Sequence, residues 1–227
     1  MTVSDALLAE AFDHHQTGGF AEAEGLYRRL LAIEPARADG LHRFGLLTAQ
    51  LGRLEEADRL LSRALALAPA DAEAAVNHAK ILRALQKPGA AAGRFRRALA
   101  MIPDLLTAFE GLGHAEREGG NLAAAAGAYG RAARLGAGAP VLHQWGIALE
   151  SIGDMDKAAE ALRRSAHLAP AMPSVALRLA GILQRLGRHS EAAGWYRHAL
   201  VLHPGHGEIR RSLTGITTLS NRREPTA

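Results

Sequence analysis

The sequence predicts an all-α fold built from repeated pairs of helices. Three observations indicate it: residue types recur about every 34 positions, alanine and leucine dominate, and glycine or proline separates the apolar segments at regular intervals. Alanine and leucine are strong helix formers, whereas proline cannot continue a helix and glycine favours turns. Repetition with such a period is typical of solenoids, in which each unit packs only on its neighbours.

Small and large residues recur in register along the chain. One column contains only alanine, a large residue follows each alanine four positions later, and five of the units close with a proline. Helices that cross closely need small residues at the contact and a large side chain in the adjoining space. The alanine column is Ala23, Ala57, Ala91, Ala125, Ala158 and Ala192, and the closing prolines are Pro35, Pro69, Pro103, Pro170 and Pro204.

These columns predict six helix-turn-helix units. In each unit a first helix ends at a turn, usually at a glycine such as Gly52, and a second helix ends before the closing proline. One residue and the closing proline are missing between Leu135 and Leu142, which places a deletion in a loop between units. The predicted units are 4–37, 38–71, 72–105, 106–138, 139–172 and 173–206, with a leader 1–3, a capping helix 207–219 and a disordered tail 220–227.

This arrangement resembles the tetratricopeptide repeat family, and the resemblance covers Ser4 to His206. It implies a right-handed α-solenoid of about six units with a C-terminal capping helix. It also implies that the first helix of each pair lines a concave groove that binds proteins or peptides. The stretch from Phe20 to His42 is similar to the bacterial repeats in the arms of O-linked N-acetylglucosamine transferase-like proteins.

Motifs for catalysis and cofactor binding are absent from the sequence. None of the three lysines follows a glycine, so there is no phosphate-binding loop, and the zinc-protease and serine-hydrolase motifs are missing. There is no cysteine, and the pairs His14–His15 and His203–His206 do not supply the three or four convergent ligands of a zinc site. We therefore expect no enzymatic activity, no cofactor and no metal site.

The charge pattern favours a cytoplasmic protein. The formal charge is +4 and arginine far outnumbers lysine, which we attribute to genome composition rather than to nucleic-acid binding. The N-terminus has no basic segment before an apolar one, as a signal peptide would. The longest uncharged stretch, Leu135 to Leu149, is shorter than the ~20 residues of a membrane helix. We therefore expect that the protein binds neither nucleic acid nor a membrane.

Basic side chains recur on the first helices of units two to four, beside the packed face. In the groove that the resemblance implies, they would face a ligand, and the same spacing places Gly111 there. Arginine can hold a carboxylate by two parallel hydrogen bonds, so we predict an acidic or carboxylate-bearing protein or peptide as the partner. Histidines in this strip would add charge below about pH 6.5. A solvated polar surface is the alternative interpretation. The predicted site residues are His42, Arg43, Asn77, Lys80, Arg83, His114 and Arg117.

Three functions agree with this sequence. The first is a non-catalytic scaffold or adaptor that binds a protein or extended peptide in the groove. The second is an accessory arm that recruits substrates for a separately encoded glycosyltransferase-like enzyme. The third is a self-assembling scaffold, in which the end of one solenoid docks in the groove of another.

Overall fold

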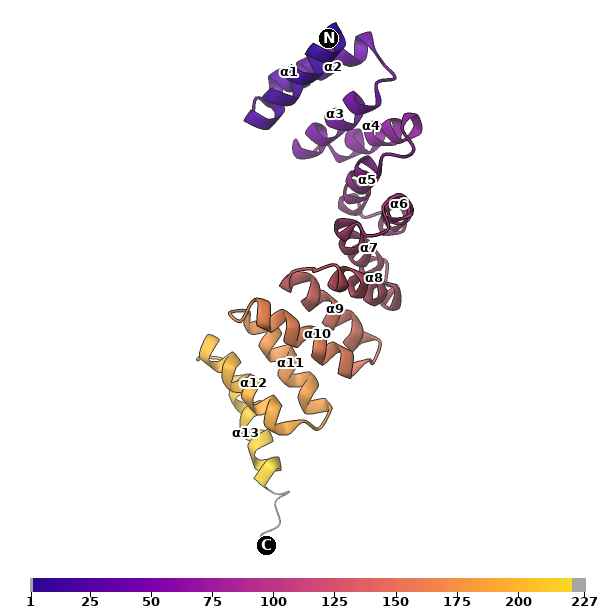
Figure 1. The fold of residues 1–227 in the computed structure, drawn as a ribbon. Helices are drawn as coiled ribbons and strands as arrows, with labels where there is room; N and C mark the ends of the chain where they lie inside the picture. Colours follow the sequence, from indigo (N-terminus) through magenta and orange to yellow (C-terminus); the bar gives the residue numbers. More distant parts are fainter. Residues whose placement is uncertain (1, 222–227) are drawn as a thin grey trace. The chain divides into compact units, whose positions relative to one another are not determined.

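The computed structural model describes residues 2–221, and the side chains of residues 2–216. Thirteen helices occupy this range in chain order, without a strand within it (Figure 1). The chain divides into two compact units, Met1–Gly119 and Gly120–Ala227, which we call the N-terminal and C-terminal units. The predicted all-α fold of helix-turn-helix pairs is confirmed. Residues 222–227 of the predicted tail lie outside the described residues.

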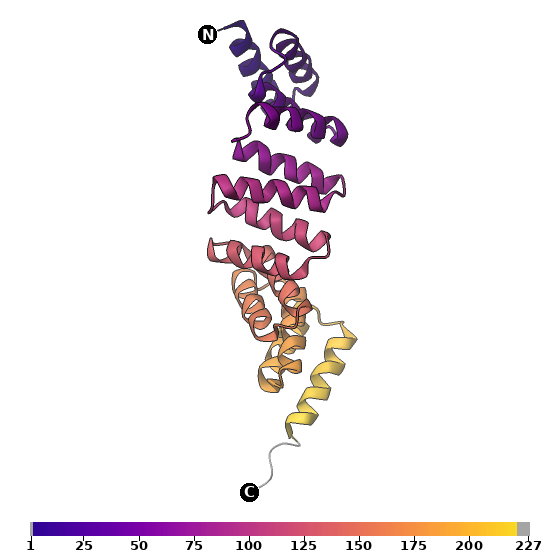
Figure 2. The same cartoon turned by 90° about the vertical axis from the view of Figure 1, so that its right-hand side faces the viewer.

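The N-terminal unit contains seven helices. Within it α1 packs on α2, α3 on α4 and α5 on α6. Figure 2 shows α3 to α6 in successive layers within this unit. Odd-numbered helices are the first helices of the pairs, and even-numbered helices are the second. The bounds are α1 (Val3–Thr17), α2 (Phe20–Ile33), α3 (Ala38–Gln50), α4 (Leu54–Leu67), α5 (Ala72–Ala84), α6 (Pro88–Met101) and α7 (Leu106–Glu118).

The C-terminal unit contains six helices, and α13 packs on α12 through the buried residues Ile209 and Ile216. α13 continues past the predicted end of the capping helix at Leu219 and reaches Asn221. The bounds are α8 (Leu122–Arg134), α9 (Ala139–Ser151), α10 (Met155–Leu168), α11 (Pro173–Arg185), α12 (His189–Leu202) and α13 (Gly207–Asn221).

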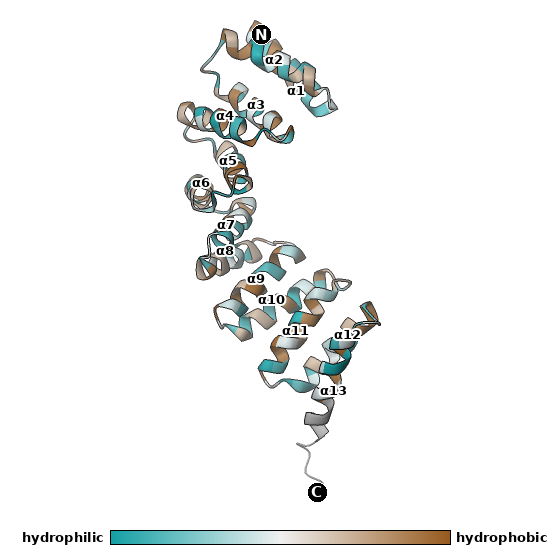
Figure 3. Ribbon diagram, turned by 180° about the vertical axis from the view of Figure 1, so that it is seen from behind, coloured by the Kyte–Doolittle hydropathy of each residue, from teal (hydrophilic) through white to brown (hydrophobic). Residues whose placement is uncertain are grey.

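The alanine column is buried in the interior of the two units. All six of its residues are fully buried, with 0% of their surface exposed. A Cβ atom on Gly146 of α9 would lie 2.7 Å from Leu162 of α10, so the small residue is required there. Along the helices, apolar segments alternate with polar ones (Figure 3). The predicted packing of small against large residues is therefore confirmed.

The turns within the pairs follow the predicted pattern. Gly52 adopts the left-handed conformation, with φ of 80°, between α3 and α4. Gln86 occupies the same place between α5 and α6 with φ of 58°, where a side chain other than glycine is uncommon.

A column of basic residues on four of the second helices, α4, α6, α10 and α12, joins each of these helices to the second helix before it in the same unit. Each donates a hydrogen bond to a carbonyl oxygen near the end of the preceding second helix, where backbone acceptors lack helical partners. Where the loop deletion removes the closing proline, Arg164 donates to the carbonyl of Ala133 instead, at 3.0 Å. These contacts give arginine a structural role at this position. The other pairs are Arg63 with Pro35 (3.0 Å), Arg97 with Pro69 (3.1 Å) and His198 with Pro170 (3.0 Å).

Candidate functional site

The seven predicted site residues all lie on first helices of the N-terminal unit. α3 carries two of them, α5 three and α7 two. They form two clusters, one between α3 and α5 and the other between α5 and α7, while Lys80 is exposed on α5.

The cluster between α3 and α5 is largely closed to solvent. Only 8% of His42 is exposed, and its Nε2 accepts a hydrogen bond from Asn77 Nδ2 at 3.1 Å. Its Nδ1 lies 3.6 Å from the Asp71 carboxylate. Arg43 has its guanidinium 3.8 Å from the centre of the Phe12 ring, a cation–π contact with α1. His42, Asn77 and Arg43 therefore already have partners within the unit.

The cluster between α5 and α7 concentrates charge. Arg83 donates from Nε and Nη2 to the two carboxylate oxygens of Glu118, at 2.9 and 2.5 Å. Arg117 Nη2 lies 3.8 Å from the same carboxylate. The hydrogen bond from Arg83 lowers the pKa of Glu118, so this group stays ionised. The Nε atom of Arg117 is buried and has no hydrogen-bond partner among the described residues.

Glu118 was not among the residues predicted from the sequence. It lies 35 residues after Arg83, one more than the repeat length, which places it one position further along the next first helix. His15 and Gln50 have the same spacing and are linked at 3.0 Å. We call such a contact between successive first helices a rung.

Two expectations about this face are wrong. Burial lowers the pKa of His114, and the charges of Arg83 and Arg117 lower it further, so His114 does not become charged at about pH 6.5. Gly111 does not lie on the open face, because a Cβ atom there would overlap the ring of Phe95 on α6.

The C-terminal unit has a hollow of about 350 Å³ between the first helices α9 and α11. Glu150 accepts hydrogen bonds there from Arg178 (2.7 Å) and Arg185 (2.9 Å). Burial and the charge of Arg178 lower the pKa of His143, so this histidine is neutral near pH 7. The lining residues are His143, Glu150, Ser174, Leu177, Arg178, Gly181 and Arg185.

Neither unit shows a recognisable metal centre or membrane segment in the part that the structure describes. Among residues 2–221, no three acidic or histidine side chains gather closely enough to hold a metal ion. None of the helices in this range combines the length and the apolar character needed to cross a bilayer.

Solved structures of low sequence identity share the fold. The C-terminal part of a TPR repeat-containing protein from Cytophaga hutchinsonii is 16% identical with a TM-score of 0.74, over 96% of this chain and 89% of that one. YrrB, described as a TPR protein with an unusual peptide-binding site, is 18% identical with a TM-score of 0.72, over 82% and 96%. MamA is 21% identical with a TM-score of 0.69, over 74% and 92%.

The sequence itself also matches a family model. No curated protein matches the chain. The model described as tetratricopeptide repeat matches residues 76–140 and 143–206, which is more than half of the chain. Together with the helix pairs and the buried alanine column, this match shows that the chain belongs to the tetratricopeptide repeat family.

Proposed function

We propose that the chain is a non-catalytic scaffold that binds an acidic protein segment or extended peptide across the first helices α5 and α7. Stacked repeats of this kind create extended surfaces for binding partners. The observation that carries the proposal is the cluster of Arg83, Arg117 and Glu118, with Lys80 exposed on α5.

The charges of this cluster favour a carboxylate ligand. Arg83 and Arg117 share one carboxylate, Glu118, so one positive charge remains unbalanced, and Lys80 adds another. The buried Nε of Arg117 is a donor without a partner among the described residues, and leaving such a group unsatisfied is costly. A ligand carboxylate near Arg117 and Lys80 would balance the charge while Glu118 holds Arg83 in place.

The test is to pan a phage-displayed library of random peptides on the full chain and to titrate the enriched peptides. We expect enrichment in Asp and Glu. The double variant Lys80→Glu/Arg117→Glu should bind these peptides about tenfold or more weakly, because two attractive charges become repulsive. Arg83 is left unchanged because its bond to Glu118 joins α5 to α7.

A matched control carries the same change of net charge elsewhere on the N-terminal unit. Arg29 and Arg59 are exposed on the second helices α2 and α4, and Arg29→Glu/Arg59→Glu should bind as the wild type does. Arg163 and Arg164 are unsuitable controls because they bond to Glu191 and to the Ala133 carbonyl. Peptides without acidic residues, or equal affinities for both double variants, would disprove the proposal.

Two narrower functions use the same kind of surface. They are the recruiting arm of a separately encoded glycosyltransferase-like enzyme and the self-assembling scaffold. Affinity capture with the full chain distinguishes them, since the first predicts an enzyme and the second predicts only further copies of the chain.

A further inference from the structure

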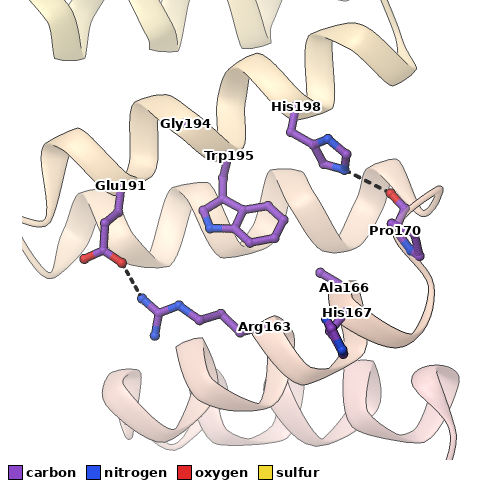
Figure 4. Close-up of a pocket in the computed structure, with 8 residues that line it drawn as sticks. All are labelled: Arg163, Ala166, His167, Pro170, Glu191, Gly194, Trp195 and His198. Carbon is purple, nitrogen blue, oxygen red and sulfur yellow. Dashed lines mark hydrogen bonds and ion pairs between the residues drawn. The ribbon is translucent and has the colours of Figure 1, made fainter.

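The second helices of the C-terminal unit carry two adjoining hollows. The larger, about 760 Å³, lies between α10 and α12 (Figure 4). The smaller, about 500 Å³, lies between α10 and the segment that leads into α9. Arg163 and His167 of α10 line both hollows and form the ridge between them. The larger is also lined by Ala166, Pro170, Glu191, Gly194, Trp195 and His198, and the smaller by Gly136, Ala137, Leu142, Arg164 and Leu168.

Both hollows have apolar surface that solvent can reach. In the larger, the Trp195 ring lies between the Arg163–Glu191 ion pair and the His198–Pro170 hydrogen bond (Figure 4). Trp195 is half-buried, and its ring meets His198 edge to face with the ring centres 5.7 Å apart. In the smaller, 59% of Leu168 is exposed. Large apolar side chains exposed beside a hollow are typical of binding surfaces.

Gly194 widens the larger hollow beside Trp195. It lies inside α12, where glycine destabilises a helix relative to alanine. Close packing does not explain it, because a Cβ atom at this position would meet no atom within 4 Å. The open space beside Gly194 belongs to the hollow that Trp195 lines.

The charges around the two hollows are mainly positive. Glu191 is the acidic residue in the lining, and it binds both Arg163 (2.7 Å) and Arg188 (2.6 Å), so this group of three keeps one positive charge. In α10 there is no acidic residue between Glu160 and the C-terminal end of the helix, and in α12 there is none between Glu191 and the C-terminal end. Basic residues in a last helical turn complement the helix dipole, which explains His167 but not Arg163 in mid-helix.

We propose that these two hollows, which we call the α10–α12 site, dock an extended acidic peptide segment that carries two bulky apolar side chains. One apolar side chain packs on Trp195 in the larger hollow, and the other packs beside Leu168 in the smaller. Carboxylates of the segment face Arg163 on the ridge and Arg164 in the smaller hollow. The site lies on second helices of the C-terminal unit and is separate from the surface on α5 and α7.

The probe is a series of fluorescein-labelled peptides of Glu and Asp that carry two leucines at increasing separation, titrated against the full chain by anisotropy. We expect one separation to bind best, and the same peptide with serines for leucines to bind about tenfold more weakly. Gly194→Glu should also weaken binding about tenfold, because it fills the hollow and repels the probe. The control Gly93→Glu on α6, where a Cβ atom likewise meets nothing within 4 Å, should bind as the wild type does.

A signal from Trp195 locates the bound probe. We expect the indole N–H resonance of Trp195 to shift on titration in the wild type and not in Gly194→Glu. The inference fails if the probe does not bind, if the two glycine variants bind equally, or if the serine peptide binds as well. Weaker binding by Lys80→Glu/Arg117→Glu but not by Gly194→Glu would assign the probe to the α5–α7 surface and overturn the α10–α12 site. Dimerisation of the wild type that Gly194→Glu abolishes would identify a second copy as the occupant, and would also overturn it.

Discussion

The two units of the chain build the same rung with opposite charges. In the N-terminal unit, Arg83 of α5 binds Glu118 of α7. In the C-terminal unit, Glu150 of α9 binds Arg185 of α11, again 35 residues later, and also Arg178. Both rungs join residues that are 35 positions apart, so the second residue lies one position further along the next first helix. The side chains determine the charge that each surface offers to a ligand.

The interiors of the units differ as well. In the N-terminal unit, His78 is 2% exposed and donates from Nε2 to Asp58 at 2.7 Å, and Asp58 also accepts from Lys87 at 3.0 Å. The Nδ1 atom of His78 is buried without a hydrogen-bond partner in the described part of the chain. The buried polar residues described for the N-terminal unit are Ser4, His42, Thr48, His78 and Glu116, and for the C-terminal unit Ser165. The N-terminal unit therefore depends more on polar contacts for its packing.

The largest expected difference is between two glycines on first helices. Gly111→Ala in the N-terminal unit should destabilise by about 1–3 kcal/mol, because the new methyl group overlaps the Phe95 ring. Gly181→Ala in the C-terminal unit should stabilise by up to about 1 kcal/mol, because its Cβ lies 3.9 Å from the nearest atom, Tyr196 Oη, and alanine favours the helix. Urea denaturation measures both changes. Equal effects would show that the Gly111–Phe95 contact relaxes freely.

How far the sequence predicted this molecule depends on the kind of contact. The alanine column, the Gly52 turn and the helix pairs followed from residue type, because backbone geometry and side-chain size determine them. The helix faces of His42, Arg43 and Arg83 were predicted, but their partners were not. A partner such as Glu118 depends on how two helices are offset by one residue, and periodicity alone does not give that offset.

The rungs should show smaller effects. Arg83→Glu places two carboxylates together, and adding Glu118→Arg restores an ion pair with the charges exchanged, as in the C-terminal unit. Both side chains are less than a third exposed, so we expect a coupling of about 0.5–1 kcal/mol in a double-mutant cycle of unfolding free energies. The same cycle on Glu150 and Arg185 should give a smaller coupling, because Arg178 remains to bind or repel whatever replaces Glu150. Additive changes in the first cycle would mean that the α5–α7 rung contributes nothing to stability.

The smallest expected effect is a difference in pH dependence between the units. Burial lowers the pKa of His78, the charges of Arg94 and Lys87 lower it further, and the contact with Asp58 opposes them without prevailing. The unfolded chain therefore binds a proton at about pH 6.5 that the folded chain resists, and stability falls as the pH drops through this value. His114 adds to the effect in the N-terminal unit, and burial lowers the pKa of His143 in the C-terminal unit. The carboxyl groups Asp58 and Glu118 have lowered pKa values and do not titrate in this window.

Hydrogen exchange at pH 7.5 and 5.5 should thus show a larger loss of protection in α4 to α6 than in α10 to α12. His78→Leu, which places the residue of Leu112 and Leu179 at this repeat position, should reduce that loss in α4 to α6. An unchanged loss in His78→Leu would assign the pH dependence to other groups.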